Sequence, residues 1–155
     1  MSNFIPQEVF NQILQNVPIA CVDVAIAANG AVLLVKRSDP PAKGQWWLPG
    51  GRIYKGEMMR ETALRKAREE VGINCHAGPI IHTAETIFLD GPHCIPIHSI
   101  NSCFFMYPAE REFSIRLDRH LQDYMWVDQI PKGLHPYVQR CLLGAGLEFK
   151  EKNGI

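Results

Sequence analysis

The sequence lacks the usual features of secreted, membrane-spanning and nucleic-acid-binding proteins. Its five cysteines are an odd number without a C-x-x-C pair, which argues against a disulfide framework or a zinc knuckle. No apolar run reaches the ~18 residues of a membrane span, and the N-terminus carries no signal-peptide pattern. Lysine and arginine balance aspartate and glutamate, 16 against 16, so no overall field attracts nucleic acid or an anionic membrane. These absences favour a cytoplasmic protein that binds neither nucleic acid nor membrane.

The chain also lacks repeats, low-complexity tracts and linkers, so we expect a single domain over residues 1–155. Strand-like and helix-like hydrophobic patterns are interspersed, and Asn29-Gly30 between two strand-like runs is a hairpin signal. This combination favours an α/β fold in which a mixed β-sheet is sandwiched between helices. The expected helices cover 6–17, 57–71 and 131–143, and the expected strands cover 21–28, 31–37, 80–89, 97–107 and 123–127.

The helix expected over 57–71 follows a glycine turn and carries two adjacent carboxylates. Glu69 and Glu70 project in neighbouring directions, at ~100° per residue, and Lys66 lies between them one turn earlier. All three are expected on the side away from the apolar face. Two carboxylates on one rigid helix suit Mg²⁺, and a glycine before the helix can offer its carbonyl to the same ion. A plain surface helix with i,i+4 salt bridges is the alternative.

The spacing around this helix resembles the box of the Nudix hydrolases, G-x5-E-x7-R-E-U-x-E-E-x-G-U, in which U is a bulky aliphatic residue. The resemblance implies a Nudix fold and hydrolysis, with Mg²⁺ or Mn²⁺, of a nucleoside diphosphate linked to another group. It also implies that the Gly50 carbonyl, Glu69 and Glu70 hold the metal. The matching residues are Gly51, Glu57, Arg65, Glu69, Glu70, Gly72 and Ile73.

Two positions depart from the box. Ala67 replaces a larger aliphatic residue, which only shrinks a packing contact. Lys66 replaces a glutamate that serves as a metal ligand or base in many family members. Because an ammonium group cannot bind a cation, we expect the site to hold fewer ions or to use another base. Attack at phosphorus therefore does not follow from the family resemblance alone.

Outside the box the sequence resembles the GDP-mannose mannosyl hydrolases, a Nudix branch that also lacks this glutamate. The likeness is clearest over residues 4–73 and is carried by FIPQEVF, PIACVDVAI, KRSDPPAKGQWWLPGGR and, further on, DYMWV. In that branch water attacks the anomeric carbon of the sugar with inversion, and GDP and free mannose are released. The resemblance implies a small-molecule nucleotide sugar as substrate, GDP-mannose or GDP-glucose, and suggests a homodimer.

The branch resemblance implies a set of substrate-binding residues. Arg37 and Arg52 match arginines that face the diphosphate, a task that suits the planar donor fork of a guanidinium group. Lys36, beside Arg37, is included in this expected site. Phe4 matches an N-terminal aromatic residue that packs on the base. Asp23 matches an aspartate near the substrate, and within the apolar run CVDVAI it must face an edge or be paired, because burying a lone carboxylate is costly.

The general base is expected from the loop LDRHLQDYMW. His120 has suitable chemistry, since an imidazole has an ordinary pKa near ~6.5. Its register differs by one from the branch, and Arg119 precedes it where the branch has a metal-binding glutamine. Gln122 is the candidate for the displaced metal ligand. Ser99 stands where the branch has a tyrosine that reaches the phosphates, which leaves the preferred sugar and nucleotide open.

Two other functions compete with this interpretation. One is a Nudix pyrophosphatase that cleaves a P–O–P bond, and the other is a Nudix domain that binds a nucleotide without turnover. Lys66 is the best support for the non-catalytic alternative, whereas the intact Glu57, Arg65, Glu69 and Glu70 argue against it.

Overall fold

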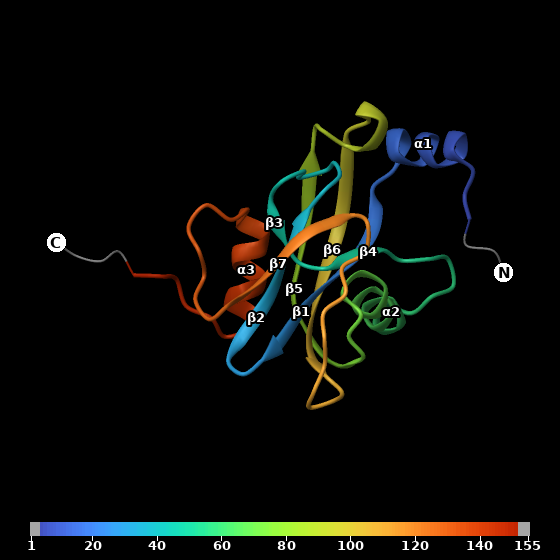
Figure 1. Cartoon of the computed structure of the whole chain (residues 1–155). Helices are drawn as coiled ribbons and strands as arrows, with labels where there is room; N and C mark the ends of the chain where they lie inside the picture. The colour runs from blue at the N-terminus through green and yellow to red at the C-terminus, as the bar shows by residue number, and fades with distance from the viewer. Residues whose placement is uncertain (1–3, 152–155) are drawn as a thin grey trace.

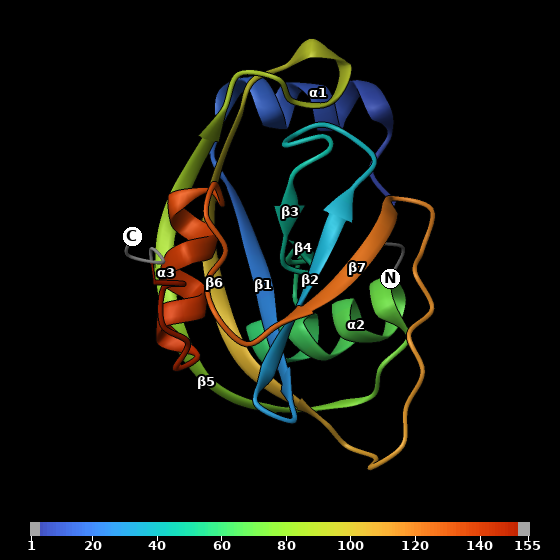
Figure 2. The same cartoon turned by 60° about the vertical axis from the view of Figure 1, so that its left-hand side comes forward.

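The computed structural model describes residues 4–151 and consists of a mixed β-sheet with helices packed on both of its faces (Figure 1). α2 and α3 cover opposite faces, and α1 lies across one end of the sheet (Figures 1 and 2). The helices are α1 (Gln7–Asn16), α2 (Met59–Val71) and α3 (Pro136–Gly144), with a short 3-10 helix, η1 (Pro92–Cys94). The strands are β1 (Ile19–Ala28), β2 (Ala31–Arg37), β3 (Trp46–Trp47), β4 (Gly50–Arg52), β5 (Cys75–Phe88), β6 (Ile97–Pro108) and β7 (Leu121–Val127).

The strands are arranged in the order β3-β2-β1-β6-β5, with β4 paired to β1 and β7 paired to β2. β1 and β6 run parallel, whereas all the other strand pairs are antiparallel. β1 pairs with β2 only next to their turn, at Ala27 and Ala28, and pairs with β4 and β6 further back. Because β1 diverges from β2, its middle part pairs with β4 and β6 instead. Asp23 lies in this part of β1, opposite Gly50 of β4.

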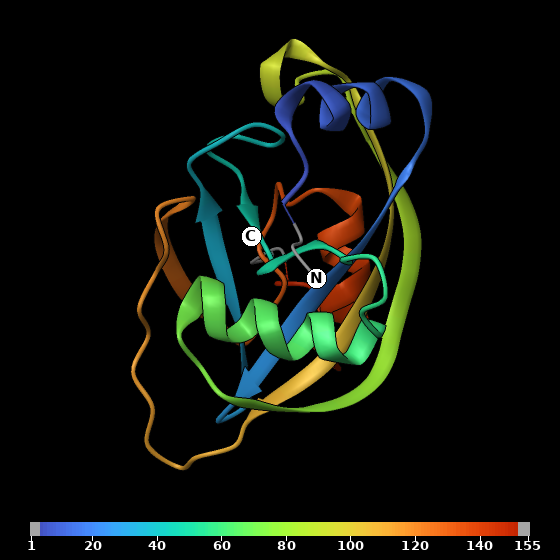
Figure 3. The same cartoon turned by 90° about the vertical axis from the view of Figure 1, so that its right-hand side faces the viewer.

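The core is divided by the sheet into two layers. Val22, Val24 and Ile26 of β1 pack with the apolar face of α2, while Ala25 belongs to the layer formed with α3. Alternate side chains of a strand point to opposite faces, so a strand with helices on both sides is apolar throughout. Figure 3 shows α2 crossing in front of β1. α2 is thereby held rigidly against the strand that carries Asp23.

The predicted α/β sandwich and the hairpin are confirmed. Asn29 and Gly30 have φ values of 52° and 78°, the left-handed conformation that this tight turn requires. Several predicted boundaries were wrong. α2 begins at Met59 rather than at 57, β5 begins at Cys75 rather than at 80, and α3 begins at 136 rather than at 131.

The glycine turn expected before α2 is instead the short strand β4, because its backbone pairs with β1. Glu57 precedes the N-cap Met58 and so lies outside α2, and its carboxylate accepts hydrogen bonds from the backbone of Tyr54 and from the side chains of Thr62 and Arg65. Within residues 4–151, no helix is long and apolar enough to cross a membrane.

Candidate active site

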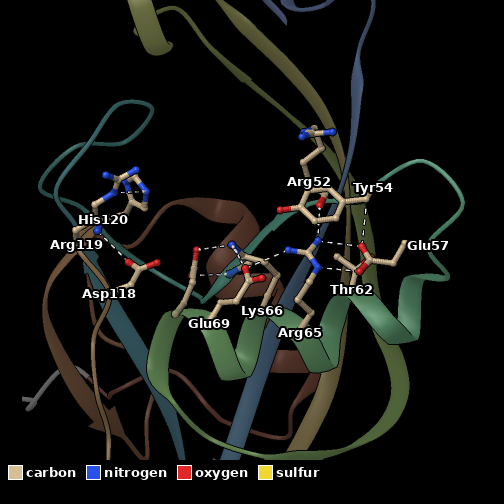
Figure 4. A network of polar contacts seen from close by, with 12 residues as sticks. Arg52, Tyr54, Glu57, Thr62, Arg65, Lys66, Glu69, Asp118, Arg119 and His120 are labelled. Atoms are coloured by element: carbon tan, nitrogen blue, oxygen red, sulfur yellow. Dashed lines mark hydrogen bonds and ion pairs between the residues drawn. The ribbon is translucent and has the colours of Figure 1, made fainter. Parts of the chain in front are cut away.

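The start of the site is a clamp between Glu57 and Arg65. The Arg65 guanidinium donates from Nε to Glu57 Oε2 at 2.7 Å and from a terminal nitrogen to Oε1 at 2.9 Å. Hydrogen bonding from Arg65, with help from Thr62, lowers the pKa of Glu57 to about 2. Arg65 also donates to the backbone carbonyl of Arg52 at 3.1 Å. The clamp therefore fixes the segment that follows β4 onto α2 (Figure 4).

The last turns of α2 bring Lys66 against both carboxylates. Lys66 Nζ lies 3.2 Å from Glu70 Oε1 and 3.6 Å from Glu69 Oε2 (Figure 4). Glu70 Oε2 accepts a hydrogen bond from the Gly50 N–H at 3.0 Å. Burial raises the pKa of Glu70, and Lys66 and the Gly50 N–H counteract this rise. The sequence did not predict the burial of Glu70, which is only 6% exposed because β4 covers it.

The two glycines of β4 make this packing possible. A Cβ at Gly50 would lie 2.3 Å from Asp23 Oδ1 and 2.5 Å from the Val22 carbonyl oxygen. A Cβ at Gly51 would lie 2.7 Å from Cε of Lys66. The absence of a side chain at Gly50 therefore leaves room for Asp23, and its absence at Gly51 leaves room for the Lys66 side chain.

A pocket of about 190 Å³ lies beside these glycines. Among its lining residues are Arg37, Arg52 and Asp23, so the structure brings three of the predicted substrate residues together. Burial raises the pKa of Cys21 in the same wall to about 12, so this side chain is a neutral thiol. The remaining lining residues are Ile19, Pro41, Ala42, Trp47, Leu48, Gly50, Gly51, Thr86, Phe88, Ile97, Ser99 and Asn101.

Asp23 is buried in the floor of this pocket and is held by neutral donors. Its Oδ2 accepts hydrogen bonds from Asn101 Nδ2 at 2.8 Å and from the Tyr137 hydroxyl at 2.7 Å. Burial raises the pKa of Asp23, and hydrogen bonds from Asn101, Tyr137 and Trp47 oppose the rise. The expectation that this carboxylate must be paired is confirmed. Its partners were not predicted.

Two arginines lie on the pocket wall in different settings. Arg37 Nε donates to the Pro41 carbonyl at 2.6 Å. The Arg52 guanidinium lies 5.1 Å from the ring centre of Tyr54 and 5.3 Å from that of Phe10. Such cation–π contacts favour a cation and restrict its position. Arg52 therefore has a defined place where α1 meets the segment after β4.

His120 is exposed in the loop before β7, outside the pocket lining. Its Nδ1 lies 2.5 Å from Asp39 Oδ2, and Arg119 Nε donates to its Nε2 at 3.4 Å. The hydrogen bond to His120 lowers the pKa of Asp39. Because Nε2 accepts, the proton of the neutral ring is on Nδ1 and points to Asp39.

The other predicted site residues are more dispersed. Gln122 donates from its amide nitrogen to the Arg37 carbonyl at 3.2 Å, which ties β7 to the end of β2. Lys36 pairs with Trp46 and Asp123 across the sheet and is not part of the pocket lining. Phe4 is 79% exposed before α1 and is also outside the lining.

The residues at the end of α2 suit a hard divalent cation in part. Glu69 and Glu70 supply carboxylate oxygens, the type of ligand that Mg²⁺ prefers, and Glu70 is buried and oriented by its partners. Over residues 4–151, however, no group of three or more His, Cys, Asp or Glu side chains converges as a ligand set. Lys66 supplies a fixed positive charge where the family box has another carboxylate. These residues fit a single ion better than a cluster.

Sequence reasoning named Ser99 but missed Asn101 and Tyr137 beside Asp23 and Asp39 beside His120. Ser99 and Asn101 are two apart in one strand, so strand periodicity places them on one face and was a usable signal. Tyr137 and Asp39 lie 114 and 81 residues from their partners, and no local pattern connects such positions.

Comparison with known proteins agrees with this fold. Residues 17–136 match the family model described as the NUDIX domain. The chain is 33% identical over 147 residues to the low-salt glycan biosynthesis protein Agl8 of Haloferax volcanii, covering 89% of this chain and 88% of that one. It is 32% identical over 110 residues to the nucleoside triphosphatase NudI of Escherichia coli, covering 66% and 76% of the two chains.

A solved structure of the MutT NUDIX hydrolase from Burkholderia pseudomallei superposes with a TM-score of 0.68 at 22% identity, covering 82% of this chain and 97% of that chain. This likeness concerns the fold, and the match of the family model extends over the whole sheet, from β1 to β7, and all of α2. The chain therefore belongs to the Nudix hydrolases.

Proposed function

We propose that this hydrolase acts on a nucleoside diphosphate sugar, GDP-mannose or GDP-glucose, and that water attacks the anomeric carbon to release nucleoside diphosphate and free sugar. The observation that carries this proposal is the Lys66 ammonium, which lies between Glu69 and Glu70 where many relatives have a third carboxylate. Similarity to a protein named for glycan biosynthesis supports a sugar nucleotide as the substrate.

Attack at the anomeric carbon requires stabilisation of a departing diphosphate. The transition state at the sugar resembles an oxocarbenium ion, so negative charge develops mainly on the leaving group. Arg37 and Arg52 line the pocket and present guanidinium groups, which match phosphate oxygens as planar forks of donors. We assign both arginines to the diphosphate, with Lys36 as a nearby positive charge.

The metal in this proposal is Mg²⁺, with Mn²⁺ as a substitute, held by Glu69, Glu70 and the Gly50 carbonyl. Gln122 is proposed as a further ligand from β7. When bound, the ion supplies positive charge to the diphosphate. The chain's own contribution is the buried, oriented carboxylate of Glu70. Phe4 is proposed to pack on the nucleobase.

His120 is proposed as the general base. The Asp39 carboxylate holds a proton on Nδ1, which makes Nε2 the basic nitrogen of the ring. Arg119 Nε donates to this Nε2 at 3.4 Å, so in this proposal the attacking water displaces Arg119. The same division of roles, in which a carboxylate orients an imidazole, is used by hydrolytic triads. Asp39 is therefore assigned to position His120.

A P–O–P pyrophosphatase is the competing function, and similarity to a nucleoside triphosphatase favours it. A screen of nucleotide sugars with Mg²⁺ separates the two by their products. The proposal expects GDP and free sugar, whereas the pyrophosphatase would produce nucleoside monophosphate and sugar phosphate. Absence of turnover with every nucleotide would support a domain that only binds. We also propose a cytoplasmic location, on the odd number of cysteines, and a homodimer, on the branch resemblance.

A further inference from the structure

The pocket floor contains a continuous chain of hydrogen bonds from β5 to β1. Thr86 and Ser99 are register partners on β5 and β6, and their hydroxyl oxygens lie 2.8 Å apart. Ser99 Oγ donates to Asn101 Oδ1 at 2.6 Å, and Asn101 Nδ2 donates to Asp23 Oδ2 at 2.8 Å. All four residues line the pocket and are only 4% to 6% exposed.

The hydroxyl donors of this chain are both used inside it. Thr86 and Ser99 have one hydroxyl proton each, and the acceptors within reach are Asn101 Oδ1 and each other's oxygen. Ser99 donates to Asn101, so Thr86 donates to Ser99 or to Asn101. In either arrangement no hydroxyl proton is left to point into the pocket.

The same is true at the other end of the chain. The Tyr137 hydroxyl donates to Asp23 Oδ2. Burial raises the pKa of this phenol, so the hydroxyl keeps its proton. The two hydroxyl oxygens of this floor, on Thr86 and Ser99, therefore have lone pairs to offer and no free proton, whereas the Asn101 amide has a second N–H besides the one donated to Asp23.

We propose that Thr86 and Ser99, with Asn101 and Asp23 behind them, are specificity-determining residues that accept hydrogen bonds from an uncharged, donor-bearing part of the ligand. Sugar hydroxyls and nucleobase N–H groups share this chemistry. Phosphate oxygens do not, because they are acceptors and the hydroxyl groups of the floor have no free proton to donate to them. The floor thus excludes the diphosphate and leaves it to the arginines of the wall. This inference rests on the proposed function for the identity of the ligand.

A matched control exists on the same two strands. Thr83 and Ser102 are also register partners, with hydroxyl oxygens 3.1 Å apart, and neither lines the pocket. Thr83→Val therefore removes the same chemistry from the same sheet without touching the floor.

The test compares Thr86→Val, Thr86→Ser and Thr83→Val in the full chain. Thr86→Val keeps the shape and removes the acceptor, and it should raise the KM for GDP-mannose by about 3- to 10-fold, the range for one neutral hydrogen bond, with kcat little changed. Thr86→Ser should restore the KM because it restores the hydroxyl, and Thr83→Val should match the wild type. The inhibition constant of pyrophosphate should stay unchanged in all three variants.

The inhibition constant of GDP identifies the source of the donors. If it is unchanged in Thr86→Val, the floor reads sugar hydroxyls, and if it rises with the KM, the floor reads N–H groups of the base. A KM equal to that of the wild type, or an equal change in the pyrophosphate constant, would overturn the inference. If the wild type hydrolyses no nucleotide sugar, the proposed function fails, and calorimetric Kd values for the same ligands and variants then test the floor separately.

Discussion

Two buried carboxylates, on either side of Gly50, are stabilised in different ways. Glu70 is 6% exposed and is stabilised by the Lys66 ammonium and the Gly50 N–H. Asp23 is 4% exposed and is held by neutral donors, among them Asn101. Burial raises the pKa of both groups, so their depth does not distinguish them.

The difference lies in the partners and in what can replace them. The Lys66 ammonium shows that a cation can be held against the Glu70 carboxylate, so a metal ion can compete with the ammonium group for the same oxygens. The donors to Asp23, Asn101 and Tyr137, are neutral, so no cation holds this carboxylate that a metal ion could replace. The end of α2 is therefore suited to a metal and a diphosphate, and the floor around Asp23 is suited to recognition of an uncharged group.

The largest predicted effect concerns Glu70. Glu70→Gln keeps the size of the side chain and removes its charge, so kcat/KM should fall by more than about 100-fold. This exceeds the loss of activity that follows when a residue that only supports a metal ligand is replaced. Circular dichroism should show that the fold survives. Glu69→Gln is the matched control on the next residue, which is exposed, and it should cost less. Near wild-type turnover of Glu70→Gln at saturating Mg²⁺ would remove Glu70 from the site.

A second prediction asks whether His120 activates water. His120→Gln should lower kcat by about 100-fold and should abolish the acid limb of the pH–rate profile. Asp39→Asn should lower kcat less, because it only loosens the ring. If the acid limb persists in His120→Gln, the base is another group, such as Asp118 or a metal-bound hydroxide, and the loop loses its proposed role.

The third prediction tests the cation beside Glu70. Lys66→Met leaves a buried carboxylate unpaired, which should lower the free energy of unfolding by about 3 kcal/mol. Because Mg²⁺ can replace the missing charge, the Tm of this variant should rise with Mg²⁺ more than that of the wild type. Lys132→Met, at an exposed position, is the control. An equal rise of Tm with Mg²⁺ in the wild type, Lys66→Met and Lys132→Met would contradict the idea that Mg²⁺ and the Lys66 ammonium use the same position beside Glu70.

The smallest predicted effect comes from Glu57, whose pKa is shifted in the opposite direction. Its folded pKa of about 2 is below its ordinary value of 4.5, so it stabilises the fold above pH 4.5 and loses this contribution as the pH falls toward 2. Glu57→Gln should remove about 2 kcal/mol of this acid-dependent stability, allowing for partial solvent screening. Thermal melts between pH 2 and 7 measure the difference. Parallel curves for the variant and the wild type would show that the clamp contributes nothing.

These contrasts also explain how far the sequence could predict the molecule. Asn29-Gly30 and Gly72 gave correct turn and helix ends, because their left-handed conformations depend on local chemistry. The box predicted which residues of α2 come together, since their spacing follows the helix period. The burial of Glu70 was missed because β4, and not α2 itself, covers that side chain. The partners of Asp23 were missed because they come from β6 and α3.

The most direct test of the proposed reaction is the position of the broken bond. Lys66 reduces the carboxylate count expected for attack at phosphorus, whereas loss of a diphosphate from the anomeric carbon needs only charge stabilisation on the leaving group. Hydrolysis of GDP-mannose in ¹⁸O-labelled water, followed by mass spectrometry of both products, distinguishes the two. We predict the label in the sugar and none in the phosphates. Label in a phosphate product would contradict the proposal and would indicate pyrophosphatase chemistry.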